Sequence, residues 1–293
     1  LALSFVQRRE DVDEARTLAA GRAAILSKIE KPAAVRAYSE ILAASDGIMV
    51  ARGDLGVELP VQNVPPIQKK LVRGARRAAK PVIVATQMLE SMIESPMPTR
   101  AEVSDVATAI YEGADAVMLS AESAAGQYPI EAVMTMNAVA VEVEGDPTYR
   151  DVIEASRQVE RDSAADRIVA AAREIAEAAD IKAICCFTHS GTTAALTARE
   201  RPRVPIIALT PFTGTARRLC LHWGVNCFRT VDDVNRFKAA VVQAARAARN
   251  GGFATPEDFI VVTAGVPFNI SGTTNILRIA PCDERRIFNA EPE

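Results

Sequence analysis

The sequence predicts an α/β protein with two domains, and two observations favour this fold class. Short apolar runs alternate with longer helical segments along the chain, which is the pattern of strand–helix units built around parallel sheets. The polar break Gly145-Asp146-Pro147 then interrupts this alternation near the middle of the 293 residues, a length that accommodates two domains of ordinary size. We therefore expect one domain over residues 1–149 and a second over residues 150–293.

In the first half, five apolar runs predict strands, and each is followed by a predicted helix. The predicted strands are Ala2–Val6, Ile25–Glu30, Gly47–Ala51, Pro81–Thr86 and Ala116–Ser120. The predicted helices are Arg9–Ala20, Pro32–Ala44, Val64–Ala79, Val103–Glu112 and Pro129–Val143. Pro65 and Pro66 suit the first turn of the third helix, and Gly113 suits the end of the fourth.

Each of these strands delivers polar residues at its carboxyl end. They are Ser4, Lys28 with Glu30, Gly53 with Asp54, Thr86 with Gln87, and Ser120. Functional side chains of a (βα)₈ TIM barrel gather at this end of its strands. A closed barrel needs about eight strands, so the five present predict five βα units of such a barrel.

The second half reads as a separate α/β domain with a mostly parallel five-stranded sheet and helices on both faces. Its predicted strands are Ala183–Thr188, Ile206–Thr210, Asn226–Arg229, Phe259–Ala264 and Asn275–Ala280. Its predicted helices are Ala164–Ala179, Thr192–Arg199, Thr213–His222 and Val234–Asn250. Residues 145–164 read as a polar connection with short helical pieces.

Composition excludes several classes of protein. The net charge is −3, and no Lys/Arg-rich run indicates a nucleic-acid partner. No apolar run reaches the roughly 18–20 residues that span a bilayer, so we expect no membrane contact. The five cysteines form no Cys-x-x-Cys pair and read as reduced thiols of a cytoplasmic protein. The chain starts at Leu1, directly before the first predicted strand and without the features of a signal peptide, and we expect it to begin in the middle of the fold.

Lys28, Glu30 and Asp54 form the candidate centre of the chemistry. Side chains alternate along a strand, so Lys28 and Glu30 point the same way. One βα unit later, Asp54 reaches the equivalent end of the next strand. Two carboxylates in this place suit Mg²⁺ that holds a phosphate, and the lysine suits charge on a transferring phosphoryl group. A plain salt bridge between Lys28 and Glu30 is compatible with this interpretation as the resting arrangement.

A turn glycine and two hydroxyl residues extend this candidate site. Gly53 lacks a Cβ, so a ligand can approach its backbone, and its amide with that of Asp54 opens a short helix, where anions bind. Thr86 and Ser120 end the last two predicted strands. From the residues alone, each hydroxyl is equally well explained as a helix cap. Arg52 reads as a structural or interface cation.

The same residues carry a resemblance to the pyruvate kinase family of bacterial type. The segments that resemble its active-site signature are Ser27–Glu30, Ser45–Glu58, Ala85–Met92, Pro98–Glu102 and Met118–Ser120. The resemblance extends over essentially the whole chain. It implies barrel strands four to eight followed by a C-terminal regulatory domain, and therefore an N-terminally truncated chain that is inactive by itself.

The resemblance implies phosphoryl transfer from phosphoenolpyruvate to ADP, giving pyruvate and ATP. Glu30 and Asp54 would be the Mg²⁺ ligands, and Lys28 would stabilise the phosphoryl group in flight. Gly53, Asp54 and Thr86 would hold the substrate carboxylate, and the Thr86 and Ser120 hydroxyls would belong to the route that protonates the enolate. The family also implies K⁺, with ligands mostly in the missing N-terminal part, and a homotetramer when full length.

A second candidate site follows the first strand of the second domain. Thr188, Ser190, Gly191, Thr192 and Thr193 offer hydroxyls and helix N-terminal amides, the elements of a phosphate cradle. An ordinary Ser/Thr-rich helix cap is the plainer explanation. The resemblance implies the effector site for a phosphorylated allosteric activator, faced by the loop Gly265–Asn275. That loop lacks the Trp and Arg of fructose-bisphosphate-regulated relatives, so a sugar monophosphate or AMP fits as well.

Two other functions stay open from the sequence. One is a Mg²⁺-dependent aldolase or phosphotransferase that acts on pyruvate enolate on a related barrel, which would share the carboxylate pair but not the C-terminal domain. The other is a non-catalytic effector-binding fragment. A lactate dehydrogenase-coupled assay distinguishes these functions.

Overall fold

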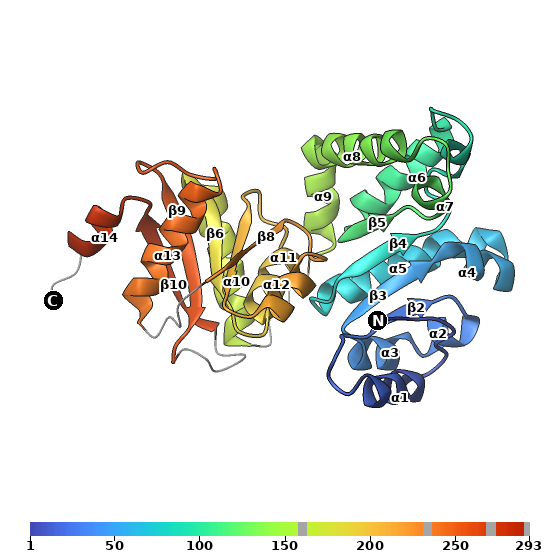
Figure 1. The fold of residues 1–293 in the computed structure, drawn as a ribbon, viewed down its shortest axis with the longest axis horizontal. Coiled ribbons are helices and arrows are strands. Elements are labelled where there is room, and N and C mark those ends of the chain that lie inside the picture. Colours follow the sequence, from blue (N-terminus) through green and yellow to red (C-terminus); the bar gives the residue numbers. More distant parts are fainter. Residues whose placement is uncertain (158–162, 231–235, 268–273, 290–293) are drawn as a thin grey trace. The chain divides into compact units, whose positions relative to one another are not determined.

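A computed structural model describes residues 1–157, 163–230, 236–267 and 274–289. The chain forms two compact units, Leu1–Arg157 and Gln158–Glu293 (Figure 1). The sequence placed the domain boundary after residue 149, within helix α9 (Pro147–Ala155). Tyr149 and Ile153 of α9 are buried in the core of the first unit, so this helix packs as part of that unit.

The first unit contains a five-stranded parallel sheet in the order β1-β2-β3-β4-β5. The strands are β1 (Ala2–Leu3), β2 (Leu26–Ile29), β3 (Gly47–Ala51), β4 (Val82–Ala85) and β5 (Ala116–Met118). Strand order therefore follows chain order, as consecutive βα units of a barrel require. All five predicted strands are present, and β3 and β4 are buried along their whole length.

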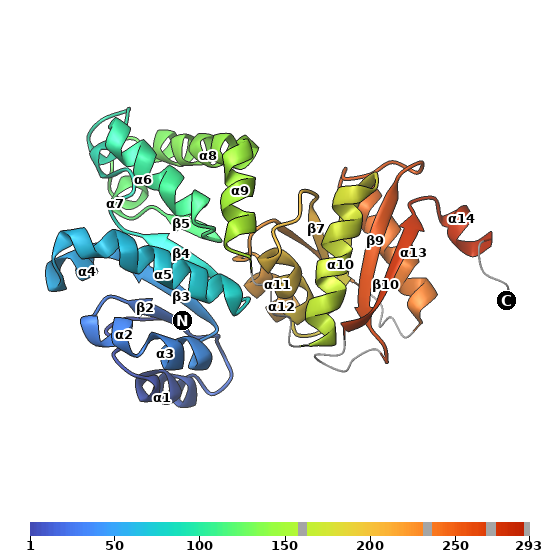
Figure 2. The same cartoon turned by 180° about the vertical axis from the view of Figure 1, so that it is seen from behind.

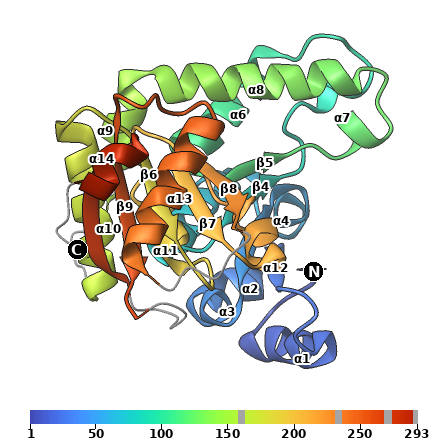
Figure 3. The same cartoon turned by 60° about the vertical axis from the view of Figure 1, so that its left-hand side comes forward.

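The helices of the first unit follow the strands in alternation. They are α1 (Arg9–Ala19), α2 (Pro32–Arg36), α3 (Tyr38–Ala44), α4 (Arg52–Glu58), α5 (Val64–Arg77), α6 (Arg100–Tyr111), α7 (Ala121–Ala124), α8 (Pro129–Gly145) and α9, with short 3₁₀ turns η1 (Val61–Asn63) and η2 (Glu90–Ile93). The long helix α8 packs beside α6 (Figure 3). Arg76 at the end of α5 donates a 2.6 Å hydrogen bond to the Ser156 hydroxyl, which ties the segment after α9 to this unit.

Several predicted helices end two or three residues away from their observed ends, and two in the first unit differ for reasons that the structure shows. The helix expected over residues 32–44 breaks at Ala37, and the break coincides with burial of Tyr38, whose hydroxyl donates to the Leu71 carbonyl of α5. The helix expected from Val103 begins at Arg100, because Thr99 and Glu102 form a reciprocal capping box. Tertiary packing in the first case and cap chemistry in the second moved the boundaries.

The second unit contains a five-stranded sheet in the order β10-β9-β6-β7-β8. Its strands are β6 (Ile181–Phe187), β7 (Ile206–Thr210), β8 (Val225–Arg229), β9 (Phe259–Gly265) and β10 (Thr274–Pro281). Only the β9–β10 pair is antiparallel, which confirms the prediction of a mostly parallel sheet.

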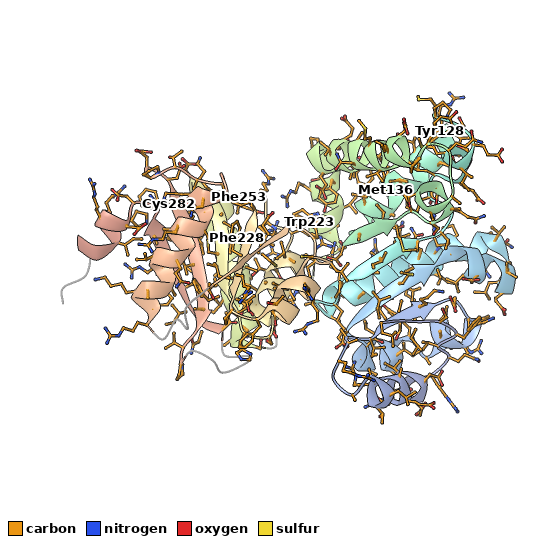
Figure 4. All side chains as sticks on the ribbon, viewed as in Figure 1. Tyr128, Met136, Trp223, Phe228, Phe253 and Cys282 are labelled. Carbon is orange, nitrogen blue, oxygen red and sulfur yellow. The ribbon has the colours of Figure 1, made fainter. Side chains whose placement is uncertain are left out.

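Helices cover both faces of this second sheet. They are α10 (Ala164–Ala178), α11 (Thr192–Arg199), α12 (Thr213–Leu219), α13 (Phe237–Asn250) and the short α14 (Glu284–Asn289). Cys185 points into a core shared with α13, whereas Cys186 points into a core shared with α10 and α11. Figures 1 and 2 view these opposite faces. Phe228 and Phe253, labelled in Figure 4, meet edge-on with ring centroids 6.4 Å apart. None of the helices in the described ranges combines the length and apolar character that a membrane span requires.

Candidate active site

Lys28 and Glu30 lie together at the carboxyl end of β2. Lys28 Nζ is 2.9 Å from Glu30 Oε2 and also donates a 2.9 Å hydrogen bond to Ser4 Oγ. The Phe5 amide donates to Glu30 Oε1 at 2.6 Å. The Glu30 side chain is only 1% exposed, compared with 24% for Lys28. The strand alternation that placed both side chains on one face is therefore confirmed.

One oxygen of Glu30 has capacity left for a ligand. Oε2 is buried and meets the criteria for no hydrogen bond with the described residues, but the Lys28 ammonium pairs with it at 2.9 Å. A carboxylate oxygen has two lone-pair sites, so this ion pair leaves Oε2 able to bind a further cation. A hard oxygen donor of this kind fits Mg²⁺.

Asp54 lies on the first turn of α4, directly after β3, and its side chain is exposed.

Lys31, which the sequence analysis missed, lies close enough to Glu30, Asp54 and Glu58 for their negative charges to act on its ammonium. Its Nζ is 2.7 Å from Glu58 Oε1. The hydrogen bond to Glu58 raises the pKa of Lys31, and the charges of Glu58, Glu30 and Asp54 raise it further. The Lys-Ile-Glu-Lys run from Lys28 to Lys31 is the sequence signal that could have identified it.

The described residues contain no group of three or more His, Cys, Asp or Glu side chains placed to hold a metal ion. Glu30 and Asp54 are the two carboxylates that the sequence predicts for a metal site here. This fits Mg²⁺, which is commonly held by one or two carboxylates together with substrate oxygens and water.

Thr86 lies directly after β4 and contacts the start of α4. The Gly53 amide donates a 2.8 Å hydrogen bond to Thr86 Oγ1, and this hydroxyl donates at 2.6 Å to the Ala85 carbonyl. A Cβ added at Gly53 would lie 3.4 Å from Thr86 Oγ1. Thr86 and Gln87 have φ values of 71° and 54°, in the left-handed region that residues other than glycine adopt uncommonly and β-branched residues such as Thr86 adopt rarely. The structure thus brings Thr86 and Gly53 together in a strained turn.

Ser120 follows β5 at the start of α7 and is half-buried. Its amide donates a 2.6 Å hydrogen bond to Glu122 Oε2, and the Leu89 amide donates to Glu122 Oε1 at 3.3 Å. Glu122 is 3% exposed. This buried carboxylate, which the sequence analysis did not assign, therefore links the segments that follow β4 and β5.

The predicted effector residues lie in one turn between β6 and α11, but their hydroxyls differ in access. Thr188 Oγ1 accepts a 2.9 Å hydrogen bond from the amide of Gly191, whose φ is +99°. The hydroxyls of Ser190 and Thr192 lie 2.9 Å apart, and Thr192 is exposed. Thr193 is buried and shares a 2.6 Å hydrogen bond with the Thr274 hydroxyl. Part of the facing loop, residues 268–273, lies outside the described residues.

An open cavity of about 520 Å³ adjoins this turn. His189, Ser190, Phe212, Thr213 and Arg218 are among the residues that line it. The His189 and Phe212 rings have centroids 4.3 Å apart, and Arg218 Nη2 donates to the Thr215 hydroxyl at 3.2 Å. The cavity therefore offers aromatic surface and a cation close to exposed hydroxyls.

Comparison with known proteins identifies relatives of both units. The sequence profile of the pyruvate kinase barrel domain matches residues 1–133, and that of the pyruvate kinase alpha/beta domain matches residues 166–280. A pyruvate kinase of Methylorubrum extorquens is 55% identical over 280 residues, which are 96% of this chain and 58% of that protein. A pyruvate kinase of Agrobacterium vitis is 50% identical over 279 residues, 95% of this chain and 58% of that protein.

A pyruvate kinase of Geobacillus stearothermophilus is 44% identical over 283 residues, 95% of this chain and 48% of that protein. The chain thus spans about half to three-fifths of the length of these relatives. The match of the second domain argues against the enolate aldolase, which is not expected to carry that domain. With the profiles of both pyruvate kinase domains matched, the chain belongs to the pyruvate kinase family.

Proposed function

We propose that this chain carries phosphoryl-transfer residues of a pyruvate kinase, which converts phosphoenolpyruvate and ADP to pyruvate and ATP. The observation that carries the proposal is the buried Glu30 carboxylate, which keeps one oxygen without a hydrogen bond beside the Lys28 ammonium. An ammonium paired with a buried carboxylate at the mouth of a parallel sheet suits a phosphate bound through a metal.

Glu30 and Asp54 are the proposed ligands of Mg²⁺, which when bound supplies positive charge to the phosphoryl oxygens. Lys28 stabilises the negative charge of the phosphoryl group while the bond to the enolate oxygen breaks and the bond to the ADP oxygen forms. Its ion pair with Glu30 and its bond to Ser4 hold the ammonium at the end of β2 until substrate binds.

Gly53, Asp54 and Thr86 are the proposed binding residues for the substrate carboxylate. The amides at the start of α4 supply donors, and the bond from Gly53 to Thr86 fixes the hydroxyl beside them. The enolate that forms takes a proton at carbon 3, and we assign the Thr86 and Ser120 hydroxyls to that proton route. K⁺, a homotetrameric assembly and a cytoplasmic location complete the proposal by analogy with the family.

Catalytic competence can be tested in a chimera in which this 293-residue chain replaces the matching segment of the Methylorubrum extorquens relative. Pyruvate formation is followed with lactate dehydrogenase. Lys28→Met should lower kcat by about 10²–10³-fold with little change in KM, because the charge acts on the transition state. Glu30→Gln and Asp54→Asn should instead raise the Mg²⁺ concentration needed for half-maximal rate.

Arg16→Met is the matched control, since Arg16 also pairs with an acidic residue, Asp46, in the same unit but away from β-strand carboxyl ends. It should leave kcat unchanged.

An inactive chimera, or a Lys28→Met variant that changes KM alone, contradicts the proposed role. The same assay is also run on the 293 residues by themselves. We expect them to form little pyruvate, because β1 and β5 each pair on one side only within the described sheet and the barrel is therefore not closed.

We also propose that the turn over residues 188–193 binds a phosphorylated activator. The left-handed Gly191, which precedes α11, and the exposed Thr192 hydroxyl support an anion site there. We assign the direct contacts with the activator to the hydroxyls of Ser190 and Thr192. Thr188, Gly191 and Thr193 shape the turn, because the Gly191 amide donates to Thr188 and the Thr193 hydroxyl shares a hydrogen bond with Thr274.

Calorimetry on the full chain tests this site with fructose 1,6-bisphosphate, ribose 5-phosphate, glucose 6-phosphate and AMP. Thr192→Glu should abolish binding by placing a carboxylate where the phosphate lies, whereas Thr192→Gln, of similar size and neutral, should retain most of it. Ser190→Ala should weaken binding roughly tenfold, the effect of one lost charge-assisted hydrogen bond. If no compound binds, or if Thr192→Glu binds as the unmodified chain does, the turn is only a helix cap.

A further inference from the structure

Arg52, the first residue of α4, reaches from the end of β3 to the turn after β4. Its side chain is only 10% exposed. Nη2 donates to the Thr86 carbonyl at 2.6 Å and to the Gln87 carbonyl at 3.3 Å. Nη1 lies 2.6 Å from both carboxylate oxygens of Asp105 on α6. The guanidinium therefore connects the two consecutive left-handed residues to a fixed anion.

This turn needs such support because of its backbone conformation. Neither Thr86 nor Gln87 is glycine, and both have positive φ. Residues held in this region persist only where surrounding contacts determine them. Arg52 binds the carbonyl groups of these two residues, and its Nε also donates to the Ala85 carbonyl just before them at 3.4 Å. Its hydrogen bonds therefore act on the strained peptide units and on the residue that leads into them.

We propose that Arg52 is a positioning residue that holds the Thr86–Gln87 turn, and through it the Thr86 hydroxyl, against the Gly53 amide. Asp105 orients the guanidinium. The inference rests on the proposed function, in which Thr86 and Gly53 hold the substrate carboxylate. A lysine cannot replace this contact fully, because an ammonium lacks the planar fork that binds a carboxylate and two carbonyl groups at once.

Amide exchange of the full chain, measured by NMR, tests the positioning role without any activity. In Arg52→Met, the Gly53 amide should exchange about tenfold faster or more, because its acceptor Thr86 Oγ1 moves away. The Ile48, Met49 and Val50 amides of β3 should keep their exchange rates. Arg52→Lys should fold normally and give an intermediate rate at Gly53.

Two further variants make the test specific. Gln87→Gly, added to Arg52→Met, should restore much of the protection at Gly53, since glycine adopts positive φ without cost. Arg16→Met is the control: Arg16 also donates to a carbonyl, that of Ala44, and pairs with Asp46, but is remote in sequence from this turn. It should not change exchange at Gly53.

The positioning role is wrong if Gly53 exchange is unchanged in Arg52→Met, or if the β3 amides accelerate equally. The chimera then separates this inference from the proposed function. Arg52→Met should raise KM for phosphoenolpyruvate more than it lowers kcat. If Gly53 loses protection but KM stays the same, Arg52 holds the turn as inferred and the assignment of the turn to substrate binding fails.

Discussion

At the residue scale, two carboxylates of the first unit illustrate different uses of a buried or partly buried charge. Glu102 accepts hydrogen bonds from the amides and hydroxyls of both Ser91 and Thr99. Glu30 instead keeps one buried oxygen without a hydrogen bond. Its partner on that oxygen is the Lys28 ammonium at 2.9 Å. A carboxylate with its acceptor sites filled by hydrogen bonds stabilises the fold, whereas one with a lone-pair site left is suited to a metal or substrate.

Glu102→Gln should destabilise the first unit by about 1–3 kcal/mol, because an NH₂ group would face a backbone N–H donor. Burial acts to raise the pKa of Glu102, but the hydrogen bonds from Ser91 and Thr99 outweigh it and lower the pKa. A lowered folded-state pKa contributes stability above the ordinary value of 4.5, and this contribution is lost as pH falls through the folded pKa.

Urea unfolding of the chain and of Glu102→Gln at pH 7 and near pH 3 measures this difference. The gap in unfolding free energy should shrink at the lower pH. Glu90→Gln, an exposed neighbour on η2, should show neither the loss nor the pH dependence. A gap that stays constant with pH would mean that the carboxylate charge is not involved.

At the element scale, helix ends and strand ends determine how the first unit is assembled. Lys80, just before β4, donates to the carbonyl groups of Leu42, Ala43 and Ser45 at 2.6, 2.9 and 2.6 Å. These carbonyls lie at the end of α3, where the helix leaves its acceptors unpaired and its dipole is negative. One cation therefore closes α3 and joins it to β4.

Lys80→Met should lower the free energy of unfolding by about 1.5–3 kcal/mol, the range for hydrogen bonds from a charged donor. Chemical denaturation gives the value directly. Lys70→Met, on the exposed side of α5, is the matched control and should change stability by less than about 0.5 kcal/mol. Equal effects of the two substitutions on the free energy of unfolding would show that the hydrogen bonds from Lys80 to the end of α3 do not stabilise the fold.

At the scale of the whole molecule, each unit has its own hydrophobic core. Val50 of β3 is fully buried in the core of the first unit, and Val262 of β9 is fully buried in that of the second. A unit with its own core can unfold by itself. The separate matches to a barrel profile and an alpha/beta profile agree with this division.

Val50→Ala and Val262→Ala should each lower the stability of one unit by roughly 1–3 kcal/mol. Differential scanning calorimetry should show two transitions, and each substitution should lower the midpoint of a different one. Each variant serves as the control for the other. A single transition, or equal shifts of both, would mean that the units unfold together.

The sequence predicted the elements well because their signals are local. Apolar runs and their spacing predicted each of the ten strands found among the described residues, and the mostly parallel character of the second sheet was confirmed. Helix boundaries were less accurate where a distant side chain intervened, as at Tyr38, whose hydroxyl bonds to Leu71 across 33 residues. The capping box at Thr99 and Glu102 was a local signal that went unused.

The sequence by itself determined that Lys28 and Glu30 share one face, because side chains alternate along a strand with a fixed period of two. It also determined that Gly53, Asp54, Thr86 and Ser120 lie at strand ends, because the apolar runs stop there. Only the tertiary structure decided how these residues are held. Arg52 meets Asp105 across 53 residues, and Thr193 meets Thr274 across 81. The left-handed turn at Thr86 and the burial of Glu30, whose Oε1 accepts from the Phe5 amide across 25 residues, likewise follow from packing between separate elements, which short-range periodicity does not encode.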